Sequence, residues 1–105
     1  MKVIITQTAE DSLEGIYRYK YEYSVAHADE FLSEIYGFTT DNLSEFPRLG
    51  HVYNSERGLF RLIYAKAFNI YYTIREQELF VLFIIDGSIS LNQELADPKV
   101  TLPEL

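Results

Sequence analysis

The chain has 105 residues, of which 48% are hydrophobic and 24% charged, a composition typical of one soluble globular domain rather than a disordered segment. It contains no cysteine, which excludes disulfides and thiolate metal sites. The formal net charge of −7 argues against general affinity for nucleic acids, so we expect no direct sequence-specific DNA binding. The first apolar run, Val3-Ile4-Ile5, is too short for a signal peptide or a membrane span, and we expect a cytoplasmic protein with no membrane partner.

The charges are unevenly distributed along the chain. Residues 1–47 carry a net charge of −6 and residues 76–105 carry −5, whereas residues 48–75 carry +4. The cations of this middle segment are Arg48, Arg57, Arg61, Lys66 and Arg75. Two interpretations stay open: a chance clustering of solvated charges, or a surface that binds an acidic partner.

The first half of the chain predicts a short strand and two helices. Residues 2–6 contain the β-branched run Val3-Ile4-Ile5-Thr6 and predict a strand. Thr8, with Asp11 three residues later, is a weak capping box and predicts a helix that begins just before Ala9. The apolar positions of this helix recur at helical spacing: Leu13, Ile16, Tyr17 and Tyr21. Gly15 either costs the helix about 1 kcal/mol relative to Ala or allows close packing against the second helix.

The second helix is predicted from roughly Ala26 to Phe46. Ser24 caps it or separates it from the first helix, and Gly37 is predicted to interrupt it, with a bend at that point. Pro47 ends it, because the residue before a proline is pushed away from helical angles. Residues 51–58 contain turn-forming residues and are predicted to form a loop.

Three strand-like runs follow, at residues 59–64, 68–75 and 79–86. Only three residues separate one run from the next at 65–67 and at 76–78, which indicates an antiparallel meander. The sequence therefore predicts an α+β fold: an N-terminal strand and a helical hairpin packed on one face of a small, mainly antiparallel twisted sheet. We expect one domain over residues 1–90 and a C-terminal tail over 91–105, extended or forming a short helix.

Alternation along the strands predicts which sheet face is open. Phe68, Ile70, Tyr72 and Ile74 form the core face of their strand, which leaves Tyr71 and Arg75 on the open face beside Arg61. The same alternation places Phe80, Leu82 and Ile84 there as an apolar patch. Such a patch with a charged rim is typical of a partner site. The alternatives are that the tail folds back over the patch and that Tyr71 is only a packing residue.

The order of these parts resembles the RelE/ParE family of toxins from type II toxin–antitoxin systems. The resemblance spans about residues 1–87 and is carried by the initial strand, the helical hairpin and three later motifs: Leu43-x-x-x-Pro47-x-x-Gly50, Phe60-Arg61-Leu62 and Asn69-Ile70-x-Tyr72-x-Ile74-Arg75. It implies a toxin neutralised by a cognate antitoxin, whose tail wraps the toxin and adds a helix or a strand to its surface.

The family has two branches with different targets. The RelE branch resembles ribosome-dependent ribonucleases, which use lysines, arginines and a late tyrosine for general acid–base chemistry and phosphate stabilisation. The ParE branch resembles inhibitors of DNA gyrase and needs no catalytic acid or base. This chain has Asp86-Gly87-Ser88-Ile89-Ser90 where the ribonuclease branch has basic residues, and no tyrosine follows Tyr72. The same segment also lacks the histidine and arginine that often end the last strand in the ParE branch.

The Leu-Pro-Gly break and Arg61 favour the ParE-like branch. The leading hypothesis is a toxin that inhibits growth by binding a protein target, DNA gyrase, and that serves in plasmid stabilisation. Candidate contacts for the target or the antitoxin are Arg61, Tyr71, Arg75, Phe80 and Leu82. One alternative is a RelE-like ribonuclease acting on the ribosome, with Arg61 stabilising phosphate; another is a non-toxic binding module of the same fold.

Catalytic and metal-binding patterns are weak in this sequence. The two histidines, His27 and His51, have no further ligands at a metal-binding spacing, so we expect no metal and no cofactor. The carboxylates of the predicted helices are typical of a solvated face rather than of paired-acid hydrolysis. The protein is more typical of a binding protein than of an enzyme.

Overall fold

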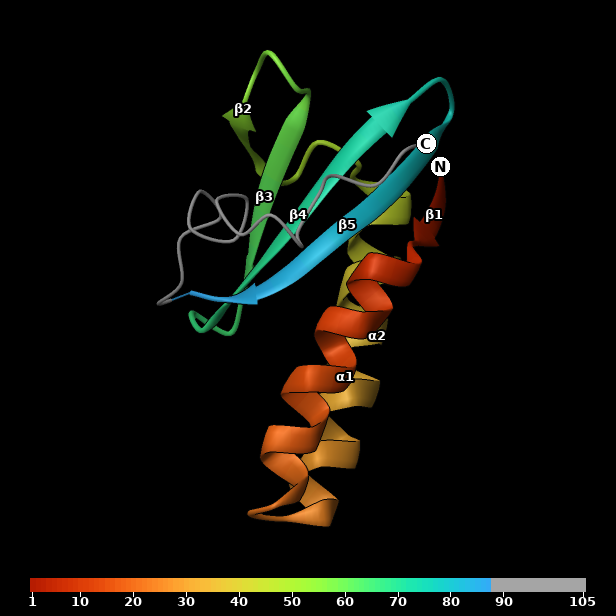
Figure 1. The fold of residues 1–105 in the computed structure, drawn as a ribbon. Coiled ribbons are helices and arrows are strands. Elements are labelled where there is room, and N and C mark those ends of the chain that lie inside the picture. The colour runs from red at the N-terminus through yellow and green to blue at the C-terminus, as the bar shows by residue number, and fades with distance from the viewer. Residues whose placement is uncertain (88–105) are drawn as a thin grey trace.

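A computed structural model describes residues 1–87 of the chain (Figure 1). This part contains β1 (Lys2–Ile5), α1 (Gln7–Tyr21), α2 (Val25–Glu45), β2 (His51–Asn54), β3 (Leu59–Tyr64), β4 (Phe68–Arg75) and β5 (Glu78–Asp86). The predicted tail over residues 91–105 lies outside the described residues, and so does the predicted domain boundary at residue 90.

The strands form one sheet in the order β1-β5-β4-β3-β2. β1 runs parallel to β5, and every other neighbouring pair is antiparallel. The helices α1 and α2 form an antiparallel hairpin that packs on one face of this sheet (Figure 1). The predicted α+β architecture and the predicted meander are therefore confirmed.

Each helix begins at a side-chain cap. The Thr6 hydroxyl accepts a hydrogen bond from the backbone N–H of Ala9 at 3.3 Å, so α1 begins at Gln7. The prediction that Thr8 caps this helix was wrong, because Thr6 gains a second bond that the local sequence does not reveal: its hydroxyl donates to the Val81 carbonyl of β5 at 2.7 Å. Ser24 caps α2 as predicted, accepting from the N–H of His27.

The helix α2 runs without a break through Gly37, so the predicted interruption there is wrong. The packing of one side of α2 on the sheet and on α1 maintains the helix across this residue, a case of tertiary contacts overriding a weak local preference. In the described part of the chain, no helix combines the length and the apolar character needed to cross a membrane.

Residues 51–54 form the edge strand β2, and the prediction of a loop at this position was wrong. β2 pairs with β3 antiparallel and has a bulge between Val52 and Asn54. Gly50 makes this pairing possible: a Cβ at Gly50 would lie 2.8 Å from the Arg61 carbonyl oxygen and 2.9 Å from the Tyr72 hydroxyl. Only glycine lets the backbone approach the sheet this closely.

The main core lies between the helical hairpin and the sheet. Its buried members from the helices are Ala9, Leu13, Phe31, Ile35 and Leu43, and those from the sheet are Leu62, Phe68, Ile70, Tyr72, Leu79, Val81 and Ile84. Because side chains alternate along each strand, this set uses one face of the sheet only. The predicted core face of β4 is confirmed: Phe68, Ile70 and Tyr72 are buried in this core, and Ile74 is packed against it.

Candidate functional site

A second apolar cluster lies on the sheet face opposite the helices. It contains Leu59, Tyr71, Leu82, Phe83 and Ile85, with Tyr53 and Phe80 packed against it. The predicted strand parity is right for Tyr71, Phe80 and Leu82, but the predicted exposure is not: Tyr71 is 1% exposed, Leu82 is 3% exposed, and Phe80 is half-buried. The apolar patch is therefore mostly buried, whereas alternation alone predicted that it would be exposed to solvent.

Ile84 does not belong to this face, and its predicted place in the patch was wrong. In the β4–β5 register, Tyr71 pairs with Phe83 and Tyr72 pairs with Val81, so Leu82 is an extra residue in β5. Such a β-bulge reverses the alternation beyond it. Ile84 consequently joins the core under the helices, while Phe83 and Ile85 take the opposite face.

Arg61 and Tyr71 lie side by side on this opposite face, as register partners in β3 and β4. The Arg61 guanidinium lies 5.6 Å from the centre of the Tyr53 ring, a cation–π contact. Burial raises the pKa of the Tyr71 hydroxyl, and hydrogen bonds from Asn69 and Arg61 oppose the shift without reversing it. Tyr71 is therefore neutral at physiological pH.

A cationic hollow of about 500 Å³ lies next to this pair, at the β3–β4 turn. Its charged lining residues are Arg61, Lys66 and Asp86, and Asn69 adds an amide. Arg75 does not contribute to it: the residue is exposed at the far end of β4, opposite Glu78, and four residues from Tyr71, about 13 Å along the strand. The structure thus groups Arg61 with Tyr71 and separates Arg75 from both.

Within residues 1–87, the outer edge of β5 is only partly covered by another strand. β1 pairs with Glu78–Val81, and the pairing ends where the Thr6 N–H donates to the Val81 carbonyl at 3.1 Å. The chain then turns into α1. Among residues 1–87, the stretch Leu82–Ile85 has β4 as its only strand neighbour. A sheet edge of this kind is able to accept an extended peptide as an added strand.

A groove of about 660 Å³ lies between this edge of β5 and the helix α1. Its apolar lining comes mainly from Ile16, Phe68, Phe83, Ile84 and Ile85, and its polar lining comes from Thr8, Asp11, Ser12, Tyr19, Lys20 and Asp86. Apolar walls with a few polar groups are typical of sites that bind a peptide or a ligand. The groove and the edge together form a candidate binding surface.

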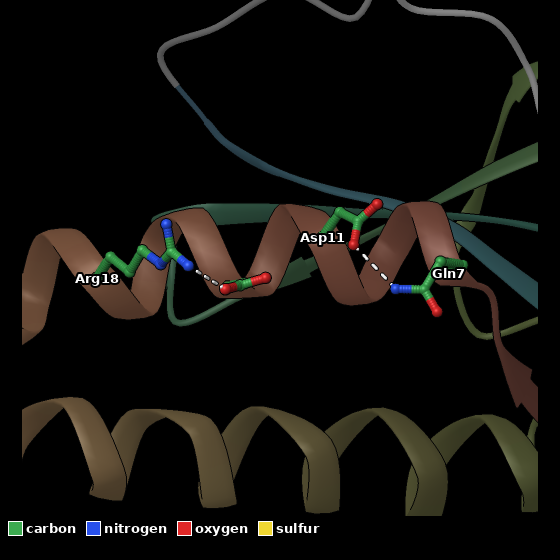
Figure 2. Close-up of polar contacts among 4 residues, drawn as sticks. Gln7, Asp11 and Arg18 are labelled. Carbon is green, nitrogen blue, oxygen red and sulfur yellow. Dashed lines mark hydrogen bonds and ion pairs between the residues drawn. The ribbon is translucent and has the colours of Figure 1, made fainter.

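Gly15 lies in this groove and not at the contact between the helices. A Cβ at Gly15 would meet no atom within 4 Å, so the predicted packing role against α2 is wrong. Along the same helix, the Gln7 amide donates to the Asp11 carboxylate at 2.9 Å, and Arg18 forms an ion pair with Glu14 at 2.5 Å (Figure 2). These contacts fix Asp11 at the groove and neutralise Arg18.

Groups for acid–base or metal chemistry are sparse in the described part of the chain. His27 lies at the start of α2, and His51 lies at the start of β2, so the two do not share a site. Among residues 1–87, no three histidine or acidic side chains are close enough to hold a metal ion. The site as built supports binding through apolar, aromatic and cationic contacts.

A short N-terminal strand, a helical hairpin and a sheet with a partly open edge define the architecture of a RelE/ParE toxin. A family model, the ParE toxin of type II toxin–antitoxin system, parDE, matches residues 3–90. The chain belongs to this family, and the predicted family is confirmed. A search of curated proteins found no match.

The sequence interpretation missed the groove and the strand β2. The groove depends on how α1 crosses the sheet, and no local pattern reveals that crossing. β2 had a usable signal: Val52 and Tyr53 have high strand propensity, and Gly50 precedes them. The turn residues Asn54, Ser55 and Gly58 obscured it, although they form the turn that connects β2 to β3.

Proposed function

We propose that this ParE-family toxin acts by binding a protein target, DNA gyrase, in the cytoplasm, and that a cognate antitoxin neutralises it. The family match over residues 3–90 carries the toxin role. The choice of a binding mechanism is supported by the burial of Tyr71 beside Arg61 and by the wide separation of Arg75 from this pair, because acid–base cleavage of RNA needs several accessible groups around one phosphate.

The antitoxin is proposed to bind along α1 and the open edge of β5. The backbone of Leu82–Ile85 offers hydrogen bonds to an added strand, and the apolar groove accepts side chains or a helix from the same partner. Arg61, Arg75 and Phe80 remain candidate contacts for the target or the antitoxin. Tyr71 and Leu82 are buried, so their proposed contribution is to hold Arg61 and the β5 edge in place.

The toxin mechanism is tested by expressing the full chain without an antitoxin and by adding the purified protein to gyrase. The expected results are growth arrest, inhibition of DNA supercoiling and an accumulation of cleaved DNA bound to gyrase. Unimpaired growth together with unaltered supercoiling would overturn the proposal and favour a non-toxic binding module.

A RelE-like ribonuclease is the second candidate, and the hollow that contains Arg61 and Lys66 is the observation that favours it. It predicts ribosome-dependent cleavage of mRNA in a reconstituted translation reaction. The substitution Arg61→Ala would abolish that cleavage. Intact mRNA, in a reaction in which gyrase is inhibited in parallel, would eliminate this candidate.

The antitoxin surface is tested with a substitution that fills the groove. Gly15→Trp places a large ring where the structure has open space, and we expect it to weaken neutralisation by the co-expressed antitoxin while growth arrest persists. Gly37→Trp is the matched control, since Gly37 also has open space at its Cβ but lies on α2, outside the groove lining. If the antitoxin neutralised both variants equally well, its binding surface would lie outside the groove.

A further inference from the structure

The tip of the helical hairpin is rich in exposed tyrosines. Tyr19, Tyr21 and Tyr23 are 64%, 49% and 76% exposed. They lie where α1 ends and the chain turns into α2, at the end of the hairpin that points away from the sheet (Figure 1). Large aromatic side chains gathered on an exposed surface are typical of protein-binding sites, because they bury much area at a low cost in side-chain entropy.

The tyrosines of the tip are arranged as two pairs, each separated by four residues. The ring centres of Tyr17 and Tyr21 are 5.8 Å apart, and those of Tyr19 and Tyr23 are 5.3 Å apart. The Tyr17 hydroxyl donates to the Asp29 carboxylate at 2.6 Å, which ties the first pair to α2. The tip is thus a preformed aromatic surface and not a set of independent side chains.

The charge around this surface is negative. Between Gln7 and Glu45 the hairpin carries nine acidic and two basic residues, a net charge of −7. Both basic residues already have partners: Arg18 is paired with Glu14, and the Lys20 ammonium lies 4.8 Å from the centre of the Phe31 ring. Two of the carboxylates, on the exposed residues Glu22 and Asp29, lie beside Tyr19 and Tyr17 respectively.

We propose that the hairpin tip is a docking surface for an arginine-bearing protein segment. Aromatic ring faces attract a guanidinium group by the cation–π effect, and guanidinium stacks on rings more readily than ammonium does. The surrounding carboxylates add long-range attraction for a basic partner. The surface adjoins the groove proposed for the antitoxin, and Tyr19 belongs to both.

A nucleic acid is the competing occupant, because tyrosines interleaved with Arg18 and Lys20 resemble a base-stacking surface. The charge of the hairpin argues against it, since a binding site for phosphates needs uncommitted cations. Here Glu14 neutralises Arg18, and the Lys20 ammonium lies over aromatic rings, at 4.8 Å from the Phe31 centre and 5.5 Å from the Phe68 centre.

The experiment compares three probes against the full chain: a nona-arginine peptide, a nona-lysine peptide and a single-stranded oligothymidylate. Binding is measured by calorimetry, and the contact residues are identified by backbone amide shifts. We expect the arginine peptide to bind about fivefold more tightly than the lysine peptide, with shifts centred on Tyr19 and Tyr23. The double substitution Tyr19→Leu and Tyr23→Leu should remove this preference.

Two further variants keep the test specific. Tyr23→Leu alone should reduce the preference for the arginine peptide and leave the groove unchanged, since Tyr23 is not among the groove residues. Phe46→Leu, at an exposed aromatic residue after α2, is the matched control and should leave the preference unchanged. Equal affinity for the two peptides, or a preference that survives in the double variant, would overturn the proposal. Shifts at Tyr19 and Tyr23 caused only by the oligothymidylate would replace it with nucleic-acid binding.

Discussion

The helical hairpin and the sheet differ in how they use their side chains. In α1 only Ala9 and Leu13 are buried, and the turns beyond Ile16 are half-buried or exposed. In β5 the whole stretch from Leu79 to Ile85 is buried, except for the half-buried Phe80. The hairpin carries a net charge of −7, and the cations Arg61 and Lys66 lie on the sheet and its β3–β4 turn.

This difference indicates that the sheet is the rigid part and that the distal hairpin depends on its helix caps and a few core contacts. Regions with few buried apolar contacts open locally at a lower free energy than a buried sheet does. A binding surface placed on the hairpin is therefore adaptable, whereas one placed on β5 is fixed in geometry. We therefore expect a Gly→Ala substitution to lower the free energy of unfolding at the sheet and to raise it in the hairpin.

The largest expected effect is that of Gly50→Ala, on the sheet side. The new Cβ would lie within 3 Å of the Arg61 carbonyl and the Tyr72 hydroxyl, and it would disturb the hydrogen bond from the Gly50 N–H to that hydroxyl. We expect a loss of about 2–3 kcal/mol in the free energy of unfolding, measured by urea denaturation. Gly15→Ala, in the open space of α1, should instead gain up to about 1 kcal/mol. Equal losses of unfolding free energy in both variants would contradict the proposed difference between the sheet and the hairpin.

The β3–β4 turn offers a smaller effect of the opposite sign. Ala65 and Lys66 occupy its two central positions with φ of 52° and 57°, where residues other than glycine and asparagine are strained. Replacing the pair with Asn-Gly should stabilise the fold by about 1–2 kcal/mol in the same urea assay. The control Lys66→Gln removes the charge but keeps the strain, and it should leave the stability nearly unchanged.

Inside the hairpin, Thr39→Val tests an unpaired polar atom. The Thr39 hydroxyl is buried and has no hydrogen-bond partner among residues 1–87, which costs free energy that an apolar side chain of the same shape would not. We expect a gain of about 1 kcal/mol in thermal or urea unfolding. Thr40→Val, the adjacent control, should destabilise the protein, because the Thr40 hydroxyl donates to the Tyr36 carbonyl at 2.8 Å.

The smallest effect at neutral pH concerns Tyr36, which joins the two helices through a hydrogen bond from its hydroxyl to the Glu10 carboxylate. Burial and this bond raise the pKa of Tyr36 well above its ordinary value of 10.0. The unfolded chain therefore loses this proton at lower pH than the folded chain does. The stabilisation is complete below pH 10.0 and is lost as the pH rises through the folded pKa.

Urea titrations at pH 8 and at higher alkaline pH should accordingly show a decline in stability above about pH 10. In Tyr36→Phe the decline should be shallower, because the titrating hydroxyl is gone. A variant with the same alkaline decline as the parent would assign the effect to other tyrosines, such as the buried Tyr72, whose pKa burial also raises.

Much of the fold was predictable because the spacing of apolar residues indicates which side of each helix or strand faces the core. The strands β3, β4 and β5 agree with the predicted runs to within one residue, and Arg61 and Tyr71 were correctly placed on the face away from the helices. Phe80 and Leu82 were also placed on that face, but Ile84 was not, since one extra residue at Leu82 reverses the later alternation. A bulge depends on the partner strand, so a single strand pattern does not reveal it.

The candidate site was less predictable than the fold. The groove forms between α1 and β5, two elements joined through the short strand β1 and the Thr6 bond to Val81, and its shape follows from their crossing. The exposure of Tyr71 and Leu82 was overestimated because strand parity gives the direction of a side chain and not what packs around it. The four-residue spacing of the tyrosine pairs at the hairpin tip can be seen in the sequence, but the exposure of their side chains cannot.

By itself, the sequence determined the family, the alternation of helices and strands, and the acidic hairpin, since these depend on local spacing and on the identity of residues. Tertiary structure alone decided the β5 register, the pairing of β2, the cap at Thr6 and the groove beside Gly15. The cap at Thr6 and the groove depend on contacts between segments far apart in the chain, and the β2 pairing and the β5 register depend on the neighbouring strand. The free energy of such contacts appears only once the backbone has brought the two segments together.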